Sequence, residues 1–179
     1  MGDDARVPAL KHVLEAFETS TEKAERSRLG MLELLSTSAQ PFERNYDIHH
    51  FTASAIVTSD RGILLHKHKR SGDWLQPGGH IDDREWPADA AMRETAEETG
   101  IMARHPAAGP LLMNVDVHHT VNGHVHYDLA YLMESDPDEP VAPEGESPDV
   151  GWFSVEDALK RTDDVCRNLI VTAMGLRLR

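Results

Sequence analysis

The chain contains one cysteine, Cys166, among 179 residues, and it therefore cannot form a disulfide bond within itself. No apolar run approaches the roughly 18 residues that a membrane-spanning helix needs. The first residues, MGDDARVPALKH, are acidic and lack the apolar centre of a signal peptide. These absences predict a cytoplasmic protein with no membrane partner.

Basic residues are also in deficit. Lysine and arginine number 18 against 31 aspartate and glutamate residues, which gives a formal net charge of −13. Because a surface of this sign repels a phosphate backbone, we expect no extended nucleic acid as a partner. With 40% hydrophobic residues, the composition is otherwise that of a globular protein.

Two short helices are predicted near the N-terminus. Apolar residues recur at helical spacing over residues 7–17 and again over residues 22–35, and Pro41 forbids continuation of the second helix. We therefore expect residues 1–45 to form a helical appendage. Its apolar stripes need a partner surface, which could be the following domain or a second copy in a homodimer.

Residues 46–179 alternate between extended and helical patterns. The runs at 51–57 and 63–69 flank a turn and predict a hairpin, and the Asn-Gly pair at 122–123 predicts a second one. A helix is predicted over 87–99, since proline is favoured at a first helical position and glycine just after a last one. The pattern indicates a single α/β domain.

The predicted helix carries an unusual density of carboxylates. Residues 79–101 hold seven acidic side chains, and Glu94, Glu97 and Glu98 share one helical face. Like charges at this spacing destabilise a helix by a few tenths of a kcal/mol per pair. A solvated acidic face is the simpler interpretation. A bound Mg²⁺ or Mn²⁺ ion, which prefers oxygen ligands and often binds substrate phosphates as well, is the functional one.

The spacing within this segment resembles the signature of the Nudix hydrolases. The matching residues are Gly79, Glu85, Arg93-Glu94, Glu97-Glu98 and Gly100-Ile101. They are separated in that order by five, seven, two and one residues. The chain departs from the pattern at Thr95, where an aliphatic residue is usual, and at Trp86, where a small capping residue is usual. The likeness extends from about residue 50 to residue 159, and a subset of the family with WLQPGGH and an HxHxD strand looks similar.

The resemblance implies a Nudix-type α/β/α sandwich with a mixed β-sheet, to which the N-terminal helical pair is added. It makes Glu94, Glu97 and Glu98 ligands of Mg²⁺ or Mn²⁺, with two or more ions when substrate is bound, and gives Gly78 a ligating carbonyl. In the family pattern Arg93 and Glu85 brace the loop by ion pairing. A local pair between Arg93 and Glu97, four residues apart, is the simpler interpretation for that arginine.

A further carboxylate is expected from the acidic loop before Trp152. Glu146 resembles a residue that many family members use as ligand or base, although Glu144 and Asp149 are close alternatives. The general base could be Glu97, Glu98 or Glu146, and the sequence does not rank them.

The activity implied is metal-dependent hydrolysis of the diphosphate linkage in a nucleoside diphosphate joined to another moiety. Two alternatives remain open. Isopentenyl diphosphate isomerases share the fold, but Gly78 stands where they carry a cysteine and Cys166 is far along the chain. A non-catalytic nucleotide sensor is the other alternative, although such modules usually have an eroded signature.

Histidines gather in the middle of the chain. If the Asn-Gly pair closes a two-residue turn, His119 faces His126 across the hairpin, and His119, His124, His126 and Asp128 share one face. This face could be a second metal site, a substrate-phosphate contact or a polar sheet surface.

Single residues near the signature are harder to assign. His80 follows the first signature glycine and should lie near bound phosphates. Trp74 could stack on a substrate base, although a core position is the commoner one. His66 and His68 are expected on the surface or in packing contacts, and His50 is ambiguous.

Overall fold

The computed structural model describes residues 4–69 and 71–177 of the chain. The ends of the two expected domains, residues 1–3 and 178–179, lie outside the described residues. The strands are β1 (His49–Ser59), β2 (Gly62–Lys67), β3 (Trp74–Leu75), β4 (Gly78–His80), β5 (Leu111–His119), β6 (Val125–Glu134) and β7 (Val150–Phe153). The helices are α1 (Arg6–Ala16), α2 (Glu22–Thr37), α3 (Pro87–Thr99), α4 (Val155–Arg161) and α5 (Asp164–Arg177).

The strands form one mixed sheet in the order β3-β2-β1-β6-β5, with β4 beside β1 and β7 beside β2. β1 runs parallel to β6, and the other pairs are antiparallel. On its other edge β1 is shared by two partners. Thr58 and Ser59 pair with β2, whereas residues 52–54 pair with β4. The sheet therefore divides along this edge of β1.

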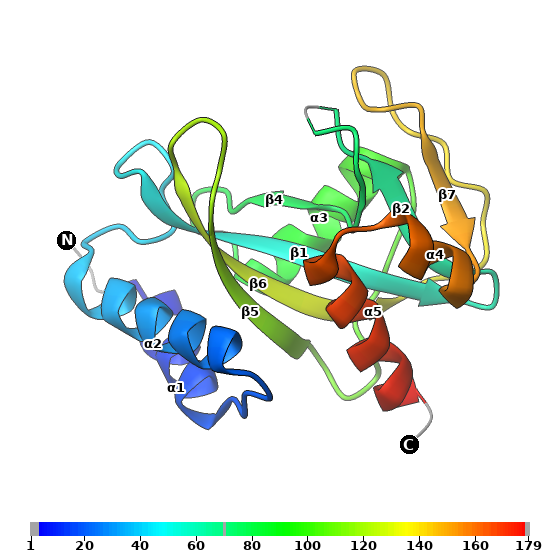
Figure 1. Cartoon of the computed structure of the whole chain (residues 1–179). Coiled ribbons are helices and arrows are strands. Elements are labelled where there is room, and N and C mark those ends of the chain that lie inside the picture. Colours follow the sequence, from blue (N-terminus) through cyan, green and yellow to red (C-terminus); the bar gives the residue numbers. More distant parts are fainter. Residues whose placement is uncertain (1–3, 70, 178–179) are drawn as a thin grey trace.

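Helices cover both faces of the sheet, as Figure 1 shows, with α3 behind β1 and α5 in front of it. One hydrophobic cluster joins α1, α2 and α3 to one face, and a second joins α4 and α5 to the other. The expected α/β/α sandwich with a mixed sheet and an N-terminal helical pair is confirmed. The predicted ends of α3 are also confirmed, since it begins at Pro87 and Gly100 caps it with a φ of 73°.

The alternation of side chains along β1 determines where the site lies. Ala53 and Ala55 are buried on the α3 side, and Ile56 is buried under α4 and α5. Thr52 and Ser54 lie on the same face as Ile56, because alternate residues of a strand point the same way. They border a cavity instead of the second hydrophobic cluster. The cavity is therefore the uncovered half of this sheet face.

The N-terminal helices share the core of the sheet. Leu14 and Met31 are fully buried and belong to the same cluster as Phe51 of β1. The hydroxyl oxygen of Ser27 accepts a hydrogen bond of 3.0 Å from the backbone N–H of Val117, which satisfies one backbone donor of the edge strand β5. The apolar stripes of both helices are used within one chain, and the homodimer stays a prediction.

The second hairpin has a different register from the one expected. Asn122 and Gly123 lie in a longer loop that is closed by the hydrogen bond from Thr120 N to His124 O. His118 pairs with His126, so the expected pairing of His119 with His126 is wrong. Since a slip of one residue turns a side chain to the other face, His118 replaces His119 beside His126.

In the part of the chain that the structure describes, no helix is both long enough and apolar enough to cross a membrane.

The shared core predicts that the N-terminal helices contribute to global stability. Leu14→Ala removes a fully buried side chain and should lower the free energy of unfolding by about 2–5 kcal/mol. Val13, its neighbour on α1, is 44% exposed, so Val13→Ala should change that free energy far less. Urea unfolding of both variants measures the difference. Equal effects would contradict docking of α1 on the sheet.

Candidate active site

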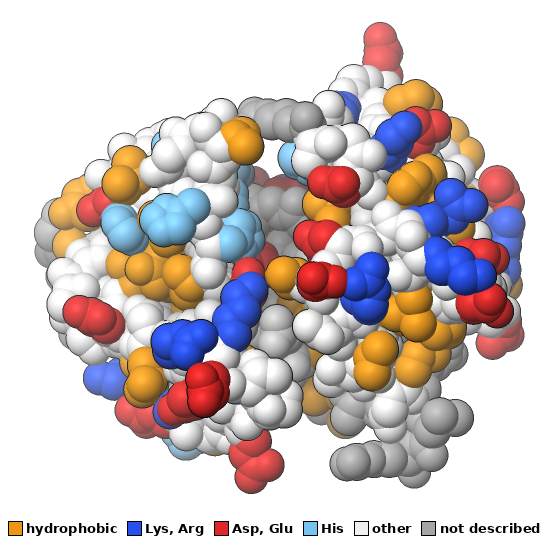
Figure 2. Space-filling view, in the orientation of Figure 1, with side chains coloured by type: hydrophobic (Ala, Val, Ile, Leu, Met, Phe, Trp, Pro, Cys, Tyr) orange, Lys and Arg blue, Asp and Glu red, His pale blue; other side chains and the backbone are white. Residues whose placement is uncertain are grey.

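A cavity of about 700 Å³ is lined by residues of β1, β2, β4, β5 and β6 and of helices α2, α3 and α5. In Figure 2 the molecule is hollowed beside a group of histidine side chains. Three glutamates that the sequence singled out line it, namely Glu94 and Glu98 of α3 and Glu146 of the acidic loop. The structure thus brings together residues that are up to 52 positions apart in the sequence, counted from 94 to 146.

The glycines of β4 are required by close packing. A Cβ atom on Gly78 would lie 2.5 Å from the Cβ of Ser54 and 2.8 Å from the backbone oxygen of Ala53. A Cβ atom on Gly79 would lie 2.5 Å from a carboxylate oxygen of Glu94. The bare backbone of β4 therefore fits between β1 and the carboxylates of α3.

Glu98 is a strongly perturbed acid of the cavity. The backbone N–H of Gly78 donates a hydrogen bond of 2.9 Å to its Oε2, and Nε2 of His66 lies 3.3 Å from the same oxygen. Desolvation raises the pKa of Glu98 to about 8 and lowers the pKa of His66 to about 4. His66 is buried and contacts Glu98 of the site. The expected surface or packing role did not include this contact.

Glu94 lies over Gly79 and accepts a hydrogen bond of 3.0 Å from Arg93. Desolvation nevertheless raises the pKa of Glu94 above its ordinary value. Two neighbouring carboxyl groups of α3 therefore resist ionisation. A bound cation would stabilise their ionised forms.

Arg93 holds the loop and the helix together. Its guanidinium donates two hydrogen bonds of 2.9 and 2.8 Å to Glu85 and one of 2.8 Å to the carbonyl oxygen of His80. Desolvation alone would raise the pKa of Glu85, but the hydrogen bonds from Arg93 and from the backbone of Asp82 lower it. Arg93 is not among the residues that line the cavity, so its contacts are those of a positioning residue.

Glu97 lies apart from the other two carboxylates of its helix. Its Oε2 is 2.9 Å from the guanidinium of Arg93, and its side chain is 57% exposed. Both interpretations of Arg93 are therefore present, since the same side chain braces Glu85 and pairs with Glu97. Glu97 is not among the described residues that line the cavity.

The acidic loop contributes one carboxylate. Oε2 of Glu146 lies 2.8 Å from Nζ of Lys69, and both side chains border the cavity. Glu144 and Asp149 are exposed and do not line it. Of the three candidates, Glu146 is the one placed beside Glu98.

Several residues of the cavity were not predicted from the sequence. Lys23 of α2 reaches into it, with Nζ 2.6 Å from Oδ1 of Asp116 on β5. Arg44 borders the same cavity from the segment before β1. No local pattern distinguishes these side chains from solvated surface charges, because only the packing of the N-terminal helices brings them to the site.

The remaining candidates fall into two groups. His80 and His126 line the cavity, and His124 lies in an adjoining hollow. Thr52 and Ser54 donate hydrogen bonds of 2.9 and 2.6 Å to Asp128 in the cavity floor. Trp74 instead packs on Phe153 with ring centroids 4.8 Å apart, so it belongs to the second hydrophobic cluster and not to the cavity.

Comparison with known proteins identifies the family. The family model for the NUDIX domain matches residues 48–171. The chain belongs to the Nudix family. The expected enzyme class, a Nudix-type pyrophosphohydrolase, is confirmed by this match together with the relatives that carry that name.

Relatives and solved structures agree with this assignment. The "Probable DHNTP pyrophosphohydrolase" of Lactococcus lactis subsp. cremoris is 29% identical over 135 residues, which cover 68% of this chain and 76% of that protein. Human diphosphoinositol polyphosphate phosphohydrolase 2 is 28% identical over 65% of this chain and 66% of its own length. A NUDIX-family hydrolase from Clostridium perfringens superposes with a TM-score of 0.62 at 27% identity, covering 72% of this chain and 97% of that one.

The contacts of Arg93 predict a fold-stabilising role that lysine cannot fill. Arg93→Lys keeps the charge but loses the forked hydrogen bonds to Glu85, so it should lower the free energy of unfolding by roughly 1–3 kcal/mol. Arg104 pairs with Asp136 at an exposed position, and Arg104→Lys should change the same quantity by less than about 0.5 kcal/mol. Thermal unfolding of the two variants tests this. A Tm unchanged by Arg93→Lys would show that the brace is dispensable.

Proposed function

We propose that this Nudix hydrolase cleaves the diphosphate linkage of a nucleoside diphosphate joined to another moiety, and that it depends on Mg²⁺ or Mn²⁺. One observation supports this above the others. The carboxylates of Glu94, Glu98 and Glu146 border one cavity beside the glycine backbone of β4. Oxygen donors in this number suit a hard divalent cation that also binds phosphate.

The residues present fit such an ion. Desolvation raises the pKa of both Glu94 and Glu98, and a divalent cation would offset that penalty by favouring the ionised form. Glu94, Glu98, Glu146 and the carbonyl oxygen of Gly78 would hold the ions. Glu97 would join them by exchanging its contact with Arg93 for the metal, and two or more ions would share the set when substrate is bound.

The reaction follows from charge. When bound, divalent ions would neutralise charge on the anionic diphosphate and would lower the pKa of the attacking water. Glu98 or Glu146 accepts the proton of the attacking water, whose oxygen forms a new bond to phosphorus. The bridging P–O bond breaks, and its electron pair leaves with the departing phosphate oxygen. His66 keeps Glu98 in place and, with a pKa of about 4, adds no positive charge at neutral pH.

Three basic side chains at the cavity suit an anionic substrate. Lys23, Arg44 and Lys69 come from three separate segments of a chain whose net charge is −13. The names of the Lactococcus and human relatives refer to hydrolysis of phosphorylated small molecules, which is consistent with a small diphosphate as substrate. A cytoplasmic location and a homodimer remain proposals from the sequence.

The isomerase alternative lacks a thiol in the right place. Cys166 is buried in the second hydrophobic cluster, and desolvation raises its pKa to about 11. It is not among the described residues that line the cavity. A buried neutral thiol outside the cavity offers no proton shuttle for such a reaction.

Removal of single carboxylates tests the proposal. With Mg²⁺ or Mn²⁺, the protein should hydrolyse at least one compound in a panel of nucleotide sugars, dinucleotides and nucleoside triphosphates. Glu98→Gln and Glu146→Gln should each lower kcat by about 10²–10⁴-fold, as expected for loss of a ligand or a base. Glu144→Gln, an exposed change in the same loop, should leave kcat near the wild-type value.

The outcomes separate the candidate functions. Metal affinity measured by calorimetry should fall in both variants, since both carboxylates are proposed to hold ions, and the variant that also loses the base should keep a low kcat at saturating metal. If no panel member is hydrolysed while one binds tightly, the protein is a sensor and the hydrolase proposal fails.

The position of Lys23 predicts that an N-terminal helix contributes to substrate binding. Lys23→Met should raise KM by roughly tenfold, which corresponds to one charge-assisted contact, while kcat changes less. Lys11→Met, at an exposed position of α1, is the control and should leave both constants unchanged. Steady-state kinetics on the active panel member measures both constants. An unaltered KM for Lys23→Met would contradict a contribution of α2 to substrate binding.

A further inference from the structure

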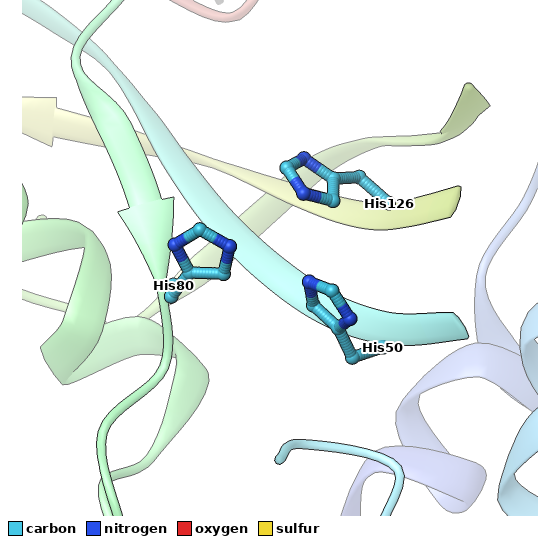
Figure 3. A group of neighbouring side chains, drawn as sticks. All are labelled: His50, His80 and His126. Carbon is cyan, nitrogen blue, oxygen red and sulfur yellow. The ribbon is translucent and has the colours of Figure 1, made fainter. Parts of the chain in front are cut away.

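Three imidazoles from three strands converge beside the cavity. His50 of β1, His80 of β4 and His126 of β6 each offer a ring nitrogen, and these nitrogens lie within 4.8 Å of one another. The sheet register makes His50 and His126 direct neighbours on parallel strands. Figure 3 shows the three rings turned toward a common space. The cluster is therefore set by backbone pairing and not by chance contact of surface side chains.

His50 is oriented as a ligand would be. Its side chain is fully buried, and its Nδ1 lies 3.1 Å from the carbonyl oxygen of Asp47. A carbonyl oxygen only accepts, so Nδ1 carries the proton and Nε2 keeps a lone pair. Among the described residues Nε2 has no hydrogen-bond partner, although it is buried. Metal-binding histidines characteristically donate their other N–H to such a carbonyl.

Two of the rings, those of His50 and His126, are also in the protonation state that binds metal. Desolvation lowers the pKa of His50, and desolvation with the neighbouring histidines lowers the pKa of His126 to about 3. Both imidazoles are thus neutral at physiological pH, and neutral imidazole is a common metal ligand. The buried, unpartnered Nε2 of His50, beside the neutral ring of His126, calls for a Lewis acid.

We propose that His50, His80 and His126 form a second metal site, which takes a divalent transition metal ion of the Zn²⁺ class. The site differs from the carboxylates of α3 in its donor atoms. Its donors are imidazole nitrogens, which suit Zn²⁺ better than Mg²⁺. Three protein ligands leave at least one coordination position for water or another oxygen donor. Because His80 and His126 also line the cavity, that position is beside the space proposed for the substrate.

The cluster must contract to bind the ion. Tetrahedral coordination with Zn–N distances of about 2.0–2.1 Å places the nitrogens about 3.3 Å apart, closer than the 4.8 Å limit of the cluster. His80 and His126 are half-buried and border the cavity, whereas His50 is fully buried and held by β1 and by Asp47. His50 is therefore the fixed ligand toward which the other two move.

Arg44 gives the competing possibility. Its guanidinium lies 3.5 Å from Nδ1 of His80 and would repel a cation or attract an anion. Arg44 is exposed and this contact is long, so the side chain can turn away when an ion binds. An anion held by Arg44 and the rings is the alternative that the experiment must exclude.

Zinc binding to defined variants tests the site. Full-length protein is stripped with a chelator and titrated by calorimetry with Zn²⁺ alone, in the presence of excess Mg²⁺. We expect one site in the wild type, and affinity about tenfold or more weaker in His80→Gln and in His126→Gln. His119→Gln, an exposed change at the end of β5, and Glu98→Gln, a change in the carboxylate site, should retain the wild-type affinity.

A second measurement does not depend on variants. X-ray absorption of the zinc-loaded wild type should show imidazole nitrogens at about 2.0–2.1 Å. The proposal is overturned if Zn²⁺ does not bind stoichiometrically, if affinity falls in Glu98→Gln but not in the histidine variants, or if only inorganic phosphate binds and depends on His80. Hydrolysis is not a readout here, so failure of the proposed hydrolase activity leaves this test unaffected.

Discussion

The close approach of β4 to β1 and α3 is the constraint on which the site depends. Because Gly78 and Gly79 carry no side chains, the β4 backbone lies against Ser54 on one side and against the carboxylate of Glu94 on the other. The same backbone donates a hydrogen bond to Glu98 and accepts one, at His80, from Arg93. The carboxylates are thereby held in a desolvated place where their charge is unfavourable without a cation. Loop geometry and the proposed cation affinity are thus two consequences of one packing arrangement.

The sheet supplies the rest of the cavity by leaving part of one face uncovered. Helices α4 and α5 cover the face around Ile56, while Thr52 and Ser54 farther along β1 border the cavity and donate hydrogen bonds to Asp128. The N-terminal helices close the far edge and bring Lys23 to Asp116. An element outside the signature therefore becomes part of the site, which offers a route to substrate selection that the signature itself does not provide.

Local patterns predicted the local half of this structure. Glu94, Glu97 and Glu98 lie within one and a half helical turns, so the sequence spacing alone places them on one face, and Pro87 and Gly100 mark the helix ends for steric reasons. The separation of Glu97 from the other two was not predictable, because it depends on competition for Arg93. The histidine face was predicted with the wrong partner, His119 instead of His118, because a longer loop shifted the register by one residue. Contacts of His66, Lys23 and Arg44 arise from packing between distant segments, and periodicity carries no signal for them.

Binding of divalent cations by the carboxylates beside β4 is tested most directly by anomalous X-ray scattering from crystals of the protein soaked in Mn²⁺. We expect an anomalous peak between Glu94, Glu98 and the carbonyl oxygen of Gly78, which disappears in Glu98→Gln or in crystals soaked with a chelator. A Mn²⁺-soaked crystal with no peak at these carboxylates would contradict this binding.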